Sequence, residues 1–152
     1  MNTSVFNPEA FEQTIIDQEN QTSFIPVPEG DYEAYIEDYA FRTFTNEDQS
    51  IQVVLNVDWV IPDEALAEQL GFDEVKVPQR VYLDLDDNGQ LEFGTNKNVG
   101  LGRLRAALGL NKPGFQWQSL RGQFGIISVG QREATDGSGN IYSNVRKVAP
   151  KS

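Results

Sequence analysis

Apolar and polar residues alternate along most of the chain, which is the pattern of β-strands with one buried face. The clearest case is IQVVLNVDWVI, residues 51–61, where Ile51 and every second residue after it are apolar. The same period of two predicts further strands over residues 31–44, 80–86, 123–129 and 140–148. The sequence therefore predicts an all-β protein of five strands.

Helix signals are fewer and shorter. Asn7 as an N-cap and Pro8 at the first helical position predict a short helix that ends near Asp17. PDEALAEQLG, residues 62–71, begins with proline and acids and ends with glycine, so it predicts a helix between the second and third strands. NVGLGRLRAALGL, residues 98–110, has apolar residues at helical spacing. The helices are minor additions to a β-rich domain.

The predicted order is strand, strand, strand, helix, strand, strand. This is the order of the OB-fold, a five-stranded Greek-key barrel with a helix between strands three and four. A five-stranded sandwich and an SH3-like barrel are the competing folds, and a helix at this position argues against both. The length of 152 residues suits one domain. We expect an OB-fold domain over residues 24–150 and an N-terminal helical or flexible segment over residues 1–23.

The residue types exclude most catalytic chemistry. The chain has no cysteine and no histidine, so disulfides, thiolate metal sites and Cys or His nucleophile systems are absent. DLDDNG, residues 84–89, matches the opening of an EF-hand loop, but Thr95 stands where that loop needs a glutamate. Asn88-Gly89 instead predicts a hairpin turn. We expect no enzymatic activity, no metal and no cofactor.

Charge is distributed unevenly along the chain. Residues 1–96 hold 21 acidic and three basic residues, a formal charge of −18, whereas residues 97–152 hold nine basic and two acidic residues, +7. Binding of a polyanion depends on local basic surface and not on the net charge of −11. Nucleic acid therefore stays open as a partner, and a dipolar surface that only aids solubility is the alternative.

The N-terminal residues MNTSVFNPEAFEQTI contain no basic region followed by an apolar run. Nowhere do eighteen apolar residues follow one another, as a membrane-spanning helix would require. We expect a cytoplasmic protein without a membrane partner.

A nucleic-acid site needs cations for phosphates and aromatic rings on which bases stack. In an OB-fold such a site runs across strands two and three and is closed by the loops between strands one and two and between strands four and five. The candidate nucleic-acid-binding residues at these places are Arg42, Phe44, Arg80, Tyr82, Arg132, Tyr142, Arg146 and Lys147. The alternative is that the tyrosines belong to the core and the arginines pair with neighbouring acids. Trp59 lies on the apolar side of its strand, so we assign it to packing.

The C-terminal third, SLRGQFGIISVGQREATDGSGNIYSNVRKVAP, resembles the end of a family of small phage-encoded OB-fold proteins found in replication and recombination modules. IPVPEGDYEAYI, residues 25–36, is similar to the start of that family, and residues 98–110 lie where the family has a leucine-rich helix. Some members bind single-stranded DNA and many are of unknown function. The resemblance implies binding of single-stranded DNA in phage replication or recombination, in the host cytoplasm, with phage replication or recombination proteins as further partners.

The chain departs from many single-stranded-DNA-binding proteins in its last residues, APKS, where those proteins have an acidic tail that recruits partners. We hypothesise that the acidic residues 9–19 take over that role. Two other functions stay open: an acidic interaction module that mimics DNA and inhibits a host nucleic-acid enzyme, and a virion structural or assembly protein. Oligomeric state and preference for DNA over RNA stay open as well, with a homo-oligomer among the alternatives.

Overall fold

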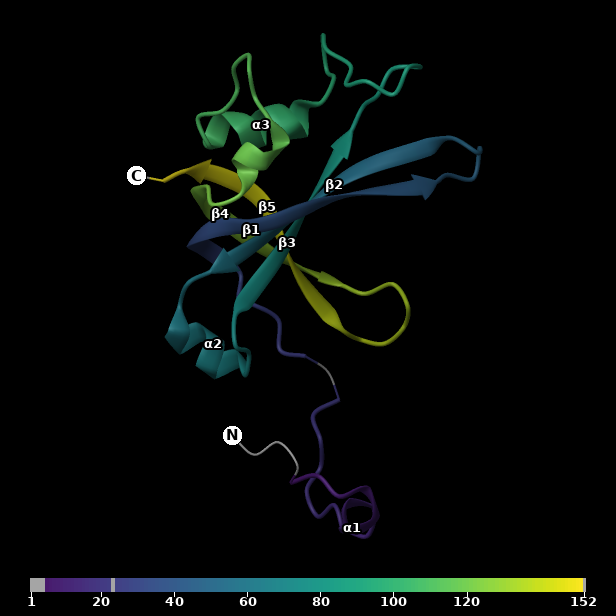
Figure 1. Cartoon of the computed structure of the whole chain (residues 1–152), viewed down its shortest axis with the longest axis vertical. Helices are drawn as coiled ribbons and strands as arrows, with labels where there is room; N and C mark the ends of the chain where they lie inside the picture. The colour runs from purple at the N-terminus through teal and green to yellow at the C-terminus, as the bar shows by residue number, and fades with distance from the viewer. Residues whose placement is uncertain (1–4, 23, 152) are drawn as a thin grey trace.

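A five-stranded antiparallel sheet forms the body of the protein, with strand order β3-β2-β1-β4-β5 (Figure 1). The computed structural model describes residues 5–22 and 24–151, so residues 1–4 and Ser23 of the predicted N-terminal segment lie outside the described part. The strands are β1 (Gly30–Thr45), β2 (Ile51–Ile61), β3 (Val75–Leu83), β4 (Phe124–Glu133) and β5 (Ile141–Pro150). The helices are α1 (Pro8–Glu12), α2 (Glu64–Leu70), α3 (Val99–Ala107) and the 3-10 helix η1 (Trp117–Leu120).

The five predicted strands and the helix between the third and fourth of them are confirmed. The predicted five-stranded Greek-key barrel does not close, because β3 and β5 are the two edges of the sheet and no hydrogen-bonded ladder joins them in the part of the chain that the structure describes. These edges nevertheless lie close together, and α3 contacts both. The result is a strongly curved, open sheet with a seam between β3 and β5.

Most element boundaries differ from the predictions by a few residues, and two of these differences have clear physical reasons. The strand predicted over residues 80–86 begins earlier, at Val75, because Pro78 is tolerated on an edge strand, where its missing N–H breaks no central ladder. Helix α1 ends at Glu12 and not near Asp17. Every residue from 5 to 22 is exposed, so no tertiary packing prolongs this helix beyond its capped first turns.

The core lies between the concave side of the sheet, α3 and η1. Trp59 is its largest fully buried side chain, as the packing assignment predicted, and its Nε1–H donates to Gln79 Oε1 at 2.8 Å. A Cβ at Gly125 would lie 3.5 Å from Trp59 Cη2, in ordinary van der Waals contact with the indole. Leu104 of α3 and Leu120 of η1 are buried against the same cluster. Helices α3 and η1 therefore cover the buried face of the curved sheet.

Residues 84–89 form the predicted turn. The Asp86 carboxylate accepts from the backbone N–H groups of Asn88 at 2.9 Å and Gln90 at 3.0 Å, and Gly89 has a φ of 77°. Leu85 and Leu91 form a β-bridge across it. In the described ranges, no group of three or more acidic side chains is arranged to hold a metal ion.

Candidate nucleic-acid interface

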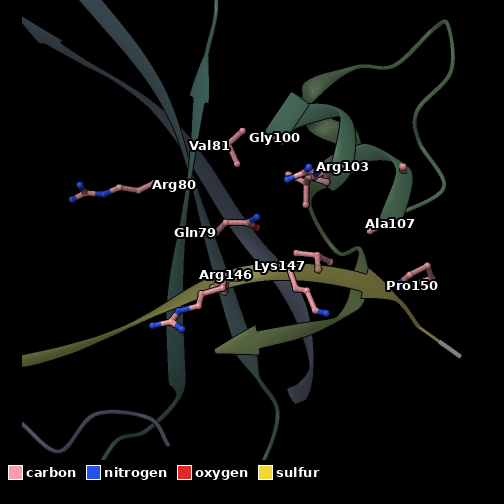
Figure 2. A pocket seen from close by; sticks show the side chains of 13 residues that line it. Gln79, Arg80, Val81, Gly100, Arg103, Ala107, Arg146, Lys147 and Pro150 are labelled. Atoms are coloured by element: carbon pink, nitrogen blue, oxygen red, sulfur yellow. The ribbon is translucent and has the colours of Figure 1, made fainter. Parts of the chain in front are cut away.

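Two cavities lie along the seam between β3 and β5. The first, the α3 cavity, is an open hollow with a volume of about 620 Å³, lined by β3, α3 and β5 (Figure 2). The second, the aromatic cavity, measures about 610 Å³ and lies between β3, β5, the end of β4 and residues 24–27. Val145 of β5 and Arg80 of β3 line both cavities, so they form one continuous seam.

The seam is basic although the whole chain is acidic. Arg80, Arg103, Arg146 and Lys147 line the α3 cavity, and Figure 2 shows that they come from β3, α3 and β5. The aromatic cavity adds Arg132 and Lys76, together with the rings of Phe24, Phe72, Tyr82 and Tyr142. Among the described residues, no acidic side chain lines either cavity. The seam thus combines cations with aromatic rings.

Most seam cations are not neutralised by the many acids of the chain. Within the described part, no ion pair involves Arg80, Arg103, Arg132 or Lys147. Arg146 is held more closely, since its Nη2–H donates to the Gln131 carbonyl at 3.2 Å and the same atom lies 3.8 Å from Glu29 Oε2. Of the arginines predicted to bind nucleic acid at the seam, only Arg146 therefore has a neighbouring acid, and this contact is long enough to leave its charge available to a phosphate.

Lys76 is the exception among the cations of the aromatic cavity. Its Nζ lies 3.0 Å from Glu37 Oε1, and this hydrogen bond, followed by the attraction of the same carboxylate, raises the pKa of Lys76 above its ordinary value. Lys76 stays charged but is already engaged, so it contributes less to an incoming anion than its neighbours do.

A β-bulge explains why Arg146 and Lys147 both face outward. Strict alternation along β5 would turn one of them into the core. Between the pairs Val129–Val145 and Ser128–Lys147 the strand contains one extra residue, Arg146, so the register shifts. Val145 is buried while Arg146 and Lys147 are both exposed. The bulge therefore supplies the seam with two adjacent cations.

Strand register places the candidate residues of β1 and β3 on one face of the sheet. Arg42 pairs with Val54, and Val54 pairs with Tyr82, so the three share a row across β1, β2 and β3. Side chains directly opposite in adjacent strands point to the same side. Tyr82 is 58% exposed, so it is a surface residue and not a core aromatic.

The other predicted residues gather at the same seam. Arg132 and Tyr142 are cross-strand partners on β4 and β5, and Tyr142 is 48% exposed. Six of the eight predicted residues line the two cavities: Arg80, Tyr82, Arg132, Tyr142, Arg146 and Lys147. Arg42 and Phe44 do not, because they lie on the part of the β1–β2 hairpin that extends beyond the body (Figure 1).

Three further seam residues with suitable side chains were not predicted from the sequence. Phe24 precedes the first strand and Phe72 follows α2, and their rings stack with centroids 6.3 Å apart. Arg103 stands on α3 between the buried Leu101 and Leu104. Arg103 could have been predicted, because helical spacing places it on the polar side of α3. Phe24 and Phe72 could not, because only folding brings them together.

A small substitution at Gly130 should displace the Arg146 side chain. A Cβ at this position would clash with the Arg146 guanidinium, which lies over the glycine, and the flexible side chain must then swing away. For Gly130→Ala we expect a loss of about tenfold in single-stranded DNA affinity, as for one lost charged contact. The free energy of unfolding should change by less than about 1 kcal/mol. Anisotropy titration and urea unfolding measure the two effects.

Gly125→Ala is the matched control. Its Cβ would lie 3.1 Å from Val148 Cγ1 and 3.3 Å from the Ala149 carbonyl oxygen, both inside a packed strand pair. Val148 also lines the α3 cavity but carries no charge, so we expect this variant to lose stability while the folded fraction keeps nearly all of its DNA affinity. Wild-type affinity in Gly130→Ala would show that the guanidinium position over Gly130 has no part in binding.

No protein-family model matches the chain, and none of the curated proteins matches it. In the part of the chain that the structure describes, no helix is both long and apolar enough to cross a membrane.

Proposed function

We propose that this protein is a single-stranded-DNA-binding protein of OB-fold type that holds DNA along the seam without reading its sequence. The acid-free lining of the seam, among the residues described, supports this most directly, because a strand of DNA presents phosphates and flat bases along its length. The phosphates bind to seam cations that form no ion pair among the described residues, namely Arg80, Arg132 and Lys147. Tyr82 and Tyr142 offer exposed rings for stacking.

The topology supports the OB-fold assignment as part of the same proposal. The order β3-β2-β1-β4-β5, the closeness of β3 to β5 and the helix between β3 and β4 are compatible with an OB-fold whose last pairing is open. OB-folds bind nucleic acid across strands two and three, and Arg42 and Tyr82 share one face of this part of the sheet. Arg42 and Phe44 on the hairpin would then extend the site beyond the seam.

Single strands are favoured over duplex for a geometric reason. Base stacking on Tyr82, Tyr142 or the Phe24–Phe72 pair needs bases whose faces are free, and a duplex buries those faces. The resemblance to small phage OB-fold proteins supports a role in phage DNA replication or recombination in the host cytoplasm. Replication or recombination proteins are the partners that this role implies.

The first test is a fluorescence-anisotropy titration of the full chain with a labelled oligomer of about 30 nucleotides. We expect binding whose log–log dependence on salt has a slope of about −3.5, from five seam cations at about 0.7 each. The five cations are Arg80, Arg103, Arg132, Arg146 and Lys147. Duplex of the same length should bind more weakly at every salt concentration.

No detectable binding of either oligomer at low salt would contradict the proposal. In that case, recovery of a nucleic-acid enzyme with the tagged protein from host lysate would favour the acidic interaction module. That alternative is supported by the charge of residues 1–96, which contain 21 acidic and three basic residues.

A further inference from the structure

The N-terminal arm, defined as residues 5–19, is apolar and acidic at once. Its helix α1 is capped by Asn7, whose Oδ1 accepts from the N–H groups of Glu9 at 3.0 Å and Ala10 at 3.3 Å. Large apolar side chains are exposed along it, namely Val5, Phe6, Phe11, Ile15 and Ile16. The arm has four acids, Glu9, Glu12, Asp17 and Glu19, and no basic residue. Such a segment is suited to an apolar surface with a basic rim.

The body carries a surface of that kind beside the seam, which we call the distal groove; Arg103 of α3 borders both. It consists of two adjoining hollows of about 430 and 440 Å³ that share Leu91 and Phe93. Its floor includes Phe41 and Trp117, whose rings meet edge to face with centroids 5.0 Å apart. Phe93 is 81% exposed. An apolar hollow exposed to this degree is typical of an interaction surface.

The rim of the distal groove is basic. Lys97, Arg103 and Arg105 line it, and no acid does so among the residues that the structure describes. Lys97 is paired with Glu92, whose Oε2 lies 3.8 Å from its Nζ, so Arg103 and Arg105 supply most of the available positive charge. Arg105 is held in place by hydrogen bonds to the Leu110 and Lys112 carbonyls and by its position over the Phe115 ring, at 4.5 Å. These contacts leave its charge uncompensated, so the rim attracts an acidic segment.

We propose that the arm of one copy of this chain docks into the distal groove of a second copy. The exposed apolar side chains of the chain fall mainly into three sets: the seam, the arm and the distal groove. In the proposed function, DNA binds the seam. The arm and the distal groove are both apolar, and the arm is acidic whereas the rim of the groove is basic. Figure 1 shows the arm extending from the end of the molecule opposite α3, so it points away from its own groove.

The contact is heterologous, because the donor surface and the acceptor surface are different parts of the chain. Each copy can therefore give its arm to one neighbour and receive an arm from another, which generates rings or open chains. The contact goes beyond the proposed DNA site and does not require DNA.

Sedimentation of the full chain over a range of concentrations, without DNA, tests the proposal. The arm variant carries Phe11→Ser and Ile15→Ser, and the groove variant carries Phe93→Glu, which removes an apolar contact and repels the acidic arm. We expect the wild type to self-associate and each variant to associate at least about tenfold more weakly. Ile51→Ser is the matched control, since Ile51 is 68% exposed on the β1–β2 hairpin, outside the groove. It should associate like the wild type.

Mixing the two variants gives the decisive result. The arm variant keeps an intact groove and the groove variant keeps an intact arm, so the mixture should form 1:1 dimers and nothing larger. A wild type that stays monomeric at about 100 μM would overturn the proposal. Variants that associate as well as the wild type, or a mixture that stays monomeric, would also overturn it.

DNA titration of the same proteins separates this inference from the proposed function. Wild-type DNA affinity in monomeric variants would leave both proposals standing. Tighter DNA binding by the arm variant, without any change in association, would mean that the arm occupies the seam, and the distal-groove proposal would be wrong. Loss of DNA binding in all proteins bears on the seam alone.

Discussion

Replacing Arg80 and Lys147 together by glutamate should weaken single-stranded DNA binding by about 1,000-fold, close to 4 kcal/mol. Both side chains line the α3 cavity, and within the described residues neither has an ion pair that the change would break. In the proposed site, each reversal would remove one phosphate contact and add a repulsive charge. The salt slope should become shallower by about 1.4, since two contacts at about 0.7 each are lost.

The control for this variant changes two cations outside the seam, Lys112→Glu and Lys151→Glu. It has the same net charge, so a purely global electrostatic effect would weaken DNA binding equally in both variants. We expect the control to lose less than about tenfold. Equal losses in the two variants would contradict a localised site, and an unchanged affinity in the seam variant would place the DNA elsewhere.

Trp59→Ala should lower the free energy of unfolding by about 3–5 kcal/mol, which is a large share of the stability of a domain of this size. Trp59 is fully buried between the sheet and the helices, and its removal leaves a cavity in the core. It also leaves Gln79 Oε1 without the indole N–H that donates to it at 2.8 Å. Urea unfolding followed by far-UV circular dichroism measures the loss.

Trp117→Ala is the comparison for this prediction. Trp117 is only half-buried and packs at the margin of the core against Phe41 and Phe115. Its truncation should cost clearly less than that of Trp59. An equal or larger loss would show that the centre of the core lies at the distal groove and not behind β2.

The strands were predictable because each has one buried face, and the period of two records that burial directly in the sequence. The helix boundaries were less predictable, because α1 has no tertiary partner, among the described residues of the body, that could prolong it. The start of β3 was missed because Pro78 normally argues against a strand, and only the position of β3 at an edge makes it acceptable.

The candidate site was predictable in its residue types and only partly in its geometry. Exposed cations and tyrosines on the strands of the seam can be identified from alternation, as Tyr82 and Tyr142 show. The bulge at Arg146 cannot be identified in this way, because a one-residue register shift leaves no periodic signal. The stacked pair Phe24 and Phe72 is equally hidden, since these rings are 48 positions apart in the sequence and lie on opposite sides of β1 and β2 in chain order.

The sequence by itself determined the five strands, the position of α3 between the third and fourth of them, and the concentration of positive charge after residue 96, because periodicity and charge are local properties. Only the tertiary structure decided that β3 and β5 stay unpaired, that Arg80 and Lys147 line the same cavity, and that no acid among the described residues lines it with them. These are relations between residues far apart in the chain, and the curvature of the sheet and the packing of α3 bring them together.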